Sequence, residues 1–184
     1  TVSLRSGSQE CELSQYQAPV IYDTYHEYFN QPTKWSCYNV HDPTVYKDGE
    51  WYYMYNTDVG MGYDAGSGAL KRRSADLVNW EFLGRAFNGI PDSARDFFLH
   101  YNPGYTDNGI WAPFLIRCGD EFRLYYSAPG GLDGIPLAYI GWAVSTSADG
   151  PWADQGMVTA SVPGDTINAI DPTVVIDRAT GQHW

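Results

Sequence analysis

The sequence predicts an all-β fold made of repeated four-stranded units, as in a β-propeller. The first observation is the phrase Asp-Pro-Thr-Val, which occurs at 42–45 and again at 171–174. The second is that each copy leads into a hairpin pattern, in which β-branched and aromatic residues flank a short Gly/Asp turn. The third is the related phrase Trp111-Ala112-Pro113, which lacks the Asp but continues in the same way.

The expected hairpins follow one another along the chain. Their turns and the strand-like runs after them are 47–50 and 51–55, 118–121 and 122–126, and 177–181 and 182–184. A second phrase, Ser-Ala-Asp, interleaves with the first at Ser74 and Ser147. Self-similarity at a roughly fixed spacing indicates a repeat architecture, and a unit of this length with four short strands fits a propeller blade. A β-sandwich with chance similarities is the alternative.

The repeats divide the chain into a leader and an incomplete propeller. Residues 1–38 are polar and irregular, and we expect them to pack on the first blade. Residues 39–184 then hold blade one to about residue 87, blade two from 110 to about 158, and the start of blade three. Between the first two blades, residues 88–109 read as a long loop, which is often functional, and the chain shows no amphipathic helix pattern of useful length.

Closure of a propeller takes about four to eight blades, and this chain holds fewer than three repeats. We therefore expect it to be the N-terminal part of a larger propeller, completed by further residues or by a companion chain. The chain starts at Thr1 rather than Met, which predicts a processed N-terminus.

Composition limits the partners. The net charge is −11 with 11 Lys and Arg residues, which argues against nucleic acid and anionic membrane surfaces because both require clustered positive charge. No apolar stretch is long enough to span a bilayer. Aromatic residues make up 16% of the chain; most suit the core of a β protein, and a few could stack on sugar rings. Cys11 and Cys37 could pair in an exported protein, leaving Cys118 over, but free buried thiols are an equal alternative.

Three phrases carry a family resemblance: His41-Asp42-Pro43, Trp111-Ala112-Pro113, and the segment 168–172, Asn-Ala-Ile-Asp-Pro. Together they resemble the signature strands of glycoside hydrolase family 43, and the third is most similar to the α-L-arabinanases of that family. The resemblance spans nearly the whole chain from about residue 38. It implies a five-bladed propeller, of which this chain supplies about the first two and a half blades, and a secreted or periplasmic enzyme.

The resemblance also implies hydrolysis of α-L-arabinofuranosyl linkages with inversion, in arabinan or a related pentose polymer of the plant cell wall. Asp42 matches the general base that activates water, and Asp171 matches the residue that raises the pKa of the general acid. Trp111 matches a groove-lining aromatic of the family, and His41, next to Asp42, and Asn168 are candidate sugar contacts. Each has a simpler alternative: an Asp before Pro often only caps a turn, Trp111 could be buried in the hub, His41 could make a structural hydrogen bond, and Asn168 could simply end a loop.

The general acid, a Glu in the family, is not found at a matching position. The six glutamates lie in the leader, before the first strand, in hairpin turns or on an outer strand: Glu10, Glu12, Glu27, Glu50, Glu81 and Glu121. We therefore expect the acid to come from sequence beyond this chain. The resemblance implies that no cofactor is required, while a structural ion such as calcium could sit near the propeller axis; its ligands cannot be assigned from this sequence.

Three rivals stay open at this point. One is a β-xylosidase or arabinofuranosidase of the same family, and another is a non-catalytic carbohydrate-binding propeller. The third is a sucrose- or fructan-cleaving propeller, which retains configuration through a nucleophilic Asp. Retention and inversion differ in the distance between the general acid and the second catalytic carboxyl group, the base or nucleophile. Inversion needs about 6.5–9.5 Å between them and retention about 5–5.5 Å.

Overall fold

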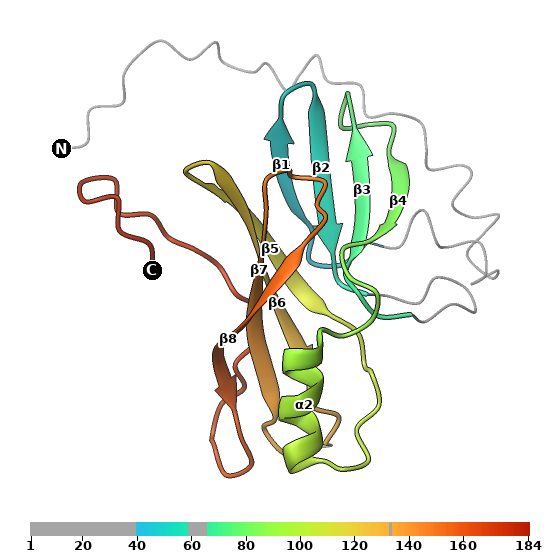
Figure 1. Cartoon of the computed structure of the whole chain (residues 1–184), viewed down its shortest axis with the longest axis vertical. Helices are drawn as coiled ribbons and strands as arrows, with labels where there is room; N and C mark the ends of the chain where they lie inside the picture. Colours follow the sequence, from blue (N-terminus) through green and yellow to red (C-terminus); the bar gives the residue numbers. More distant parts are fainter. Residues whose placement is uncertain (1–39, 59–65, 133) are drawn as a thin grey trace, which may run out of the picture.

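The computed structural model describes residues 40–58, 66–132 and 134–184. The expected leader, with Cys11 and Cys37, lies outside the described residues. Within them the chain forms two antiparallel sheets that follow one another in sequence (Figure 1).

Each sheet is a four-stranded meander in which sequence neighbours pair. The first has the order β1-β2-β3-β4 and the second β5-β6-β7-β8. Their bounds are β1 Thr44–Asp48, β2 Trp51–Asn56, β3 Leu70–Ser74, β4 Glu81–Arg85, β5 Trp111–Cys118, β6 Glu121–Pro129, β7 Ala138–Ser145 and β8 Ala153–Ser161. The all-β class and the two predicted four-stranded blades are confirmed, with the second blade extending slightly further than expected.

The Ser-Ala-Asp phrases form the turns between the third and fourth strands. The Ser74 hydroxyl accepts the Leu77 amide at 2.9 Å, and the Asp76 carboxylate accepts the Val78 and Asn79 amides. In the second blade the Ser147 hydroxyl accepts the amide of Asp149 at 3.1 Å. The repeated phrase is therefore a repeated local device: a short polar side chain satisfies turn amides that the sheet cannot pair.

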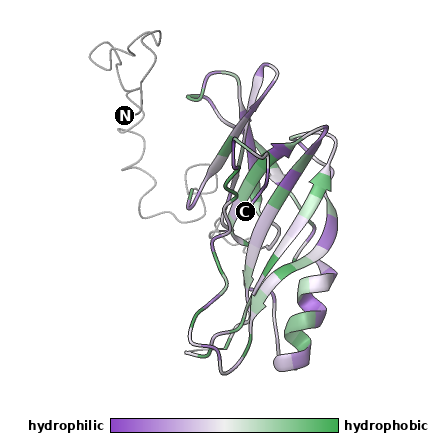
Figure 2. Ribbon diagram, turned by 90° about the vertical axis from the view of Figure 1, so that its left-hand side faces the viewer, coloured by the Kyte–Doolittle hydropathy of each residue, from purple (hydrophilic) through white to green (hydrophobic). Residues whose placement is uncertain are grey.

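One hydrophobic cluster joins the two blades. Its buried members are Tyr53, Tyr55, Leu115, Phe122, Leu124 and Ala148. Buried positions alternate with half-buried ones along much of β5 and β6 and supply this face, and Figure 2 shows hydrophobic and hydrophilic residues alternating along the strands. Tyr46 of β1 also meets Phe122 of β6 edge-to-face, with ring centroids 5.6 Å apart. The two sheets thus pack face to face, as adjacent blades do.

Tyr55 is the polar centre of this interface. Its side chain is fully buried, its hydroxyl donates to the Ala148 carbonyl at 2.8 Å, and it accepts the Trp152 indole N–H at 3.0 Å. Burial raises the pKa of Tyr55, so the hydroxyl stays protonated. One side chain of blade one therefore satisfies a donor and an acceptor of blade two.

The segment between the blades contains a helix, so the prediction of a long loop at 88–109 without a helix was wrong. The helix α2 covers Asp92–Tyr101, directly after Pro91, with Asp92 in its first turn. Its apolar residues recur at the helical spacing of Ala94, Phe97 and Phe98, and Ala94 and Phe98 are buried. Proline at a helix start and an acid in the first turn both favour this conformation.

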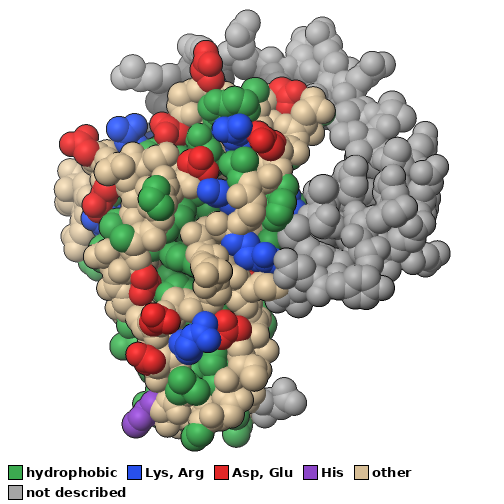
Figure 3. Space-filling view, turned by 45° about the vertical axis from the view of Figure 1, so that its right-hand side comes forward, with side chains coloured by type: hydrophobic (Ala, Val, Ile, Leu, Met, Phe, Trp, Pro, Cys, Tyr) green, Lys and Arg blue, Asp and Glu red, His purple; other side chains and the backbone are tan. Residues whose placement is uncertain are grey.

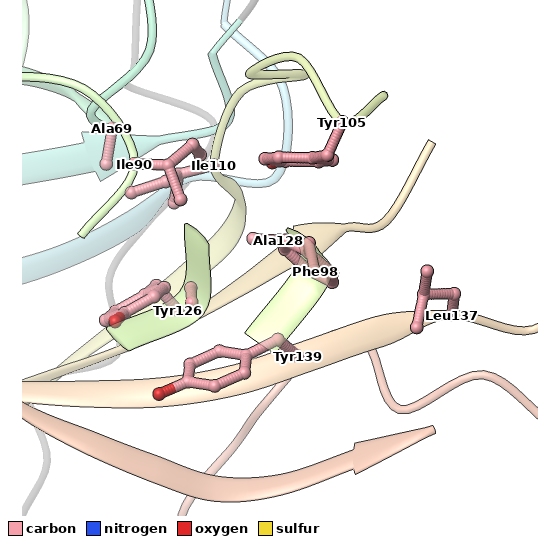
Figure 4. Close-up of a cluster of buried hydrophobic side chains, with 10 residues drawn as sticks. Ala69, Ile90, Phe98, Tyr105, Ile110, Tyr126, Ala128, Leu137 and Tyr139 are labelled. Carbon is pink, nitrogen blue, oxygen red and sulfur yellow. The ribbon is translucent and has the colours of Figure 1, made fainter. Parts of the chain in front are cut away.

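The helix packs on blade two and closes a second core. Phe98 of α2 belongs to the same buried cluster as Tyr126, Ala128 and Tyr139 of β6 and β7, which Figure 4 draws as sticks. Polar contacts complete the junction, because Asp154 of β8 accepts the hydroxyls of Ser93 at 2.6 Å and Tyr126 at 2.7 Å. Within the described ranges, no helix has the length and apolar character that crossing a membrane requires.

The expected start of blade three is only partly formed. Residues 173–176 are not a strand, and the pairing is one bridge between Ile176 and His183. Around it the amides and carbonyls of Val175 and Trp184 exchange two hydrogen bonds of 2.9 Å. The predicted turn at 177–181 is present, since the Gly181 amide donates to the Asp177 carbonyl at 2.7 Å. A two-stranded hairpin without neighbouring strands is only marginally stable, which accounts for the limited pairing here.

The blade interface predicts the effect of Tyr55→Phe. The change leaves the carbonyl of the buried Ala148 and the indole N–H of the half-buried Trp152 without this partner, so the free energy of unfolding should fall by about 1–3 kcal/mol. Urea unfolding followed by circular dichroism measures it. Tyr101→Phe is the matched control, because Tyr101 is 39% exposed. Its free energy of unfolding should change by no more than about 0.5 kcal/mol. Equal effects of the two changes would contradict the role given to the Tyr55 hydroxyl.

Candidate active site

The inner strands of the two blades, and the segment that follows β8, begin in the same unusual way. The residue before each proline has a positive φ: 50° at Asp42, 37° at Ala112 and 57° at Asp171. Positive φ is uncommon outside glycine, although Asp tolerates it better than Ala. A residue before proline is also normally extended. Three repetitions of a disfavoured conformation at one position of the repeat indicate that the surrounding structure enforces it, as happens at functional sites.

The Asp42 carboxylate is tied to the second blade through one hydroxyl. Thr57 Oγ1 donates to Asp42 Oδ2 at 2.8 Å, and Thr57 Oγ1 also accepts the Ala112 amide at 2.8 Å. The Thr57 amide also donates to the His41 carbonyl at 3.0 Å. Asp42 is exposed while Thr57 is buried. A buried residue therefore holds an exposed carboxylate beside the start of β5.

Asp171 is connected to β5 from the other side. The Ser127 hydroxyl donates to the Trp111 carbonyl at 2.9 Å and accepts the Asp171 amide at 3.4 Å. Trp111 and Ala112 are adjacent in sequence, so Asp42 and Asp171 lie on either side of the same short stretch of β5. The structure thus brings the two predicted catalytic residues to one end of the inner strands, although they are 129 positions apart in the printed sequence.

A hollow of about 350 Å³ opens next to these residues. Trp111 and Asn168, two of the predicted sugar contacts, both line it, together with Asn108, Ile170 and the β6–β7 loop. Among the described residues, Trp111 is 38% exposed. Asp42 and Asp171 do not line the hollow itself. His41 is exposed, and its carbonyl rather than its ring makes the contact described above.

The wall of the hollow includes a residue that the sequence did not single out. Asn108 lies against Gly131 of the β6–β7 loop, where an added Cβ would come within 2.7 Å of Asn108 Nδ2. Gly131 also has a φ of 71°. The loop can therefore approach Asn108 only because this position is glycine.

Asp58 organises the backbone directly after Thr57. Its Oδ2 accepts amides of Gly68 at 2.7 Å, Ala69 at 3.0 Å and Ile110 at 2.8 Å, and Arg85 Nε lies 3.8 Å from Oδ1. The side chain is only 5% exposed. Burial raises the pKa of Asp58 despite the three amides and Arg85, which act in the opposite direction. The Asp58 carboxylate thus joins the backbone just before β3 to the backbone just before β5. It thereby fixes the backbone beneath the candidate site.

The glutamates among the described residues do not join the site. Glu81 pairs with Arg73 at 2.7 Å and Glu121 with Arg123 at 2.7 Å, both away from the inner-strand starts. Glu50 is exposed in the β1–β2 turn. On the face shown in Figure 3, Lys and Arg side chains lie among Asp and Glu side chains rather than in a continuous basic patch.

No group of three or more His, Cys, Asp or Glu side chains that could hold a metal ion occurs among residues 40–58, 66–132 and 134–184. A structural ion near the propeller axis stays a prediction. Cys118 is a free thiol among the described residues, with its Sγ 3.5 Å from His183 Nδ1.

Comparison with known proteins defines the family. The model of glycosyl hydrolases family 43 matches residues 36–184, so the chain belongs to this family. Similar curated proteins are an extracellular exo-α-(1→5)-L-arabinofuranosidase of Cellvibrio japonicus, 34% identical over 79% of this chain, and the extracellular endo-α-(1→5)-L-arabinanase 1 of Bacillus subtilis, 33% identical over 82%. The chain spans 39% and 44% of the lengths of these two proteins.

Solved structures agree. A Cellvibrio cellulosa α-L-arabinanase complexed with arabinohexaose matches with a TM-score of 0.65 at 33% identity, covering 79% of this chain and 43% of that chain. The native Bacillus subtilis arabinanase matches with a TM-score of 0.65 at 32% identity, covering 79% and 46%. These enzymes are five-bladed propellers, so the two sheets described above are two blades of that fold.

The site predicts the effect of Asp58→Ala. Three amides lose their acceptor, and all three belong to the buried residues Gly68, Ala69 and Ile110, so the free energy of unfolding should fall by at least about 2 kcal/mol. Chemical unfolding of the full chain measures it. Asp120→Ala, in the exposed β5–β6 turn, is the control and should change stability by no more than about 0.5 kcal/mol. If Asp58→Ala lowered the free energy of unfolding no more than the control does, the carboxylate would not be what joins the two blades.

Proposed function

We propose that this chain is part of a glycosidase that hydrolyses α-1,5-linked L-arabinofuranosyl residues in arabinan with inversion of configuration. The observation that carries the proposal is the pair Asp42 and Asp171, which start equivalent segments of the repeat with the same left-handed backbone and flank Trp111. The linkage is the one named for both the exo-acting and the endo-acting relative.

Asp42 acts as the general base. Its carboxylate takes a proton from a water molecule, the water oxygen bonds to the anomeric carbon, and the bond to the leaving oxygen breaks. Among the described residues, Asp42 Oδ2 accepts the hydrogen bond of the Thr57 hydroxyl, so we assign Oδ1 as the oxygen that takes the proton. The exposed position of Asp42 gives water access to it.

Asp171 acts on the general acid. The leaving oxygen must receive a proton, and the described glutamates are all remote from the site, so a Glu from the rest of the propeller supplies it. A carboxylate next to that acid disfavours its ionised form and so keeps it protonated near neutral pH. The amide contact to Ser127 holds Asp171 at the edge of the site where the next blade would bring the acid.

The hollow beside Trp111 receives the sugar chain. An exposed indole and apolar side chains such as Ile170 suit the faces of furanose rings, while Asn108 and Asn168 offer amides to their hydroxyl groups. This division between apolar walls and a few polar groups is typical of small-molecule sites. His41 borders the same site next to Asp42.

Further blades complete the propeller. Tyr55 of β2 is fully buried because blade two covers it, whereas Tyr125 of β6, at the equivalent place in the hairpin, is half-buried and stacks on Trp142. Exposed apolar side chains are also found on β8 and in the segment that follows it: Met157, Val158, Ile167, Val175, Ile176 and Trp184. A surface of this kind marks a protein interface, and we infer that the remainder of the propeller covers it.

The relatives indicate where the protein works. Both curated arabinan-degrading proteins compared above are named extracellular. We infer that this protein is likewise secreted or periplasmic, where plant cell-wall polysaccharide or its oligosaccharides are its substrate. The acidic surface of the chain is consistent with a neutral polysaccharide as the partner rather than nucleic acid.

The test joins residues 1–184 to the part of the Bacillus subtilis relative that follows its matched region, and measures sugar released from linear arabinan. The fusion should hydrolyse arabinan, and the separate chain should not. Asp42→Asn should lower kcat about 1000-fold because the base is lost, and Asp171→Asn about 10- to 100-fold because the acid is less well protonated. Asp120→Asn, on an exposed turn, is the control. An active fusion in which Asp42→Asn keeps most of its rate would rule out the proposed base.

A further inference from the structure

Two hydroxyl side chains occupy equivalent places in the two blades. Thr44 pairs with Tyr55 and Phe114 pairs with Tyr125 at the same step of each hairpin. Thr57 and Ser127 each follow two residues later, so they are repeat equivalents. Both are buried, with 8% and 0% of their surface exposed. A hydroxyl thus recurs where the second strand passes the start of the inner strand.

Hydrogen-bond geometry fixes the direction in which each hydroxyl donates. At Thr57 the Ala112 amide can only donate, so Oγ1 accepts there and its single proton goes to Asp42 Oδ2. At Ser127 the Asp171 amide can only donate, so the proton goes to the Trp111 carbonyl. Neither hydroxyl can turn without leaving a buried group unpaired, which costs about 1–3 kcal/mol.

The two hydroxyls form one line of contacts across three repeats. Asp42 is held by Thr57, Thr57 by the amide of Ala112, the neighbouring Trp111 carbonyl by Ser127, and Ser127 by the amide of Asp171. In each half of this line, one contact stays within a blade and the other reaches the start of the next inner segment. The line also passes through the three residues with positive φ, so it stabilises the backbone that presents the carboxylates.

We propose that Thr57 and Ser127 are positioning residues for the hydrolysis, with Thr57 setting the orientation of the Asp42 carboxylate and Ser127 setting the backbone of Asp171. This inference rests on the proposed function. Thr57 contacts the carboxylate itself at 2.8 Å, whereas Ser127 reaches only the amide of Asp171 at 3.4 Å. Thr57 therefore has the larger effect on the rate. A misplacement of about 1 Å in a reacting group can cost about 100-fold in rate.

The test compares Thr57→Val and Thr57→Ser in the fusion described above, with linear arabinan as the substrate. Valine keeps the shape but cannot donate to Asp42, so kcat should fall about 10- to 100-fold while KM stays within about 2-fold. Serine keeps the hydroxyl, so its kcat should stay within about 3-fold of the parent. A Thr57→Val fusion with parental kcat, or a Thr57→Ser fusion as impaired as Thr57→Val, would overturn the inference.

Ser127→Ala provides an independent arm in case Thr57→Val does not fold. In the full chain, residues 1–184, amide hydrogen exchange should accelerate at Asp171 and not at Ala112, and in the fusion kcat should fall by a smaller factor than for Thr57→Val. Unchanged exchange at Asp171, or an unchanged kcat, would contradict the role of Ser127. An inactive parent fusion would instead refute the proposed function, and it is recognised before any variant is compared.

Discussion

The left-handed backbone ahead of Pro43, Pro113 and Pro172 is the constraint on which the site depends. A proline restricts the residue before it to extended conformations, and yet all three preceding residues have positive φ. Such a conformation persists only where its surroundings over-determine it. Here the surroundings are the buried hydroxyls of Thr57 and Ser127 and the packed blades behind them.

The repeat explains why the same backbone serves different ends. Asp42 and Asp171 carry a carboxylate at this position, whereas Ala112 carries none, although it bears the same strain with less tolerance for it. The conformation therefore belongs to the architecture of the blade, and the side chain placed on it decides the chemistry. Blade two contributes no carboxylate to the site. It contributes the exposed indole of Trp111 and the amide of Ala112, which donates to Thr57.

Much of the fold follows from local patterns, but contacts between blades do not. The hairpins and the turn at Ser74 were predictable because turn chemistry and alternation act within a few residues. The helix α2 was missed because its aromatic residues resemble strand residues, although the spacing of Ala94 and Phe98 was visible. Asp42 and Asp171 were predicted through a repeated phrase. Thr57 and Ser127 were not predicted, because their roles depend on hydrogen-bond partners 55 and 44 residues away.

The central claim is that Asp42 activates water on the face of the sugar opposite the leaving group. The most direct measurement is proton NMR of the first product released from linear arabinan by the fusion, before the anomers equilibrate. Inversion at an α-linked residue predicts that the β-anomer appears first. Initial release of the α-anomer would contradict the account, since it would mean that a carboxylate attacks the sugar and that configuration is retained.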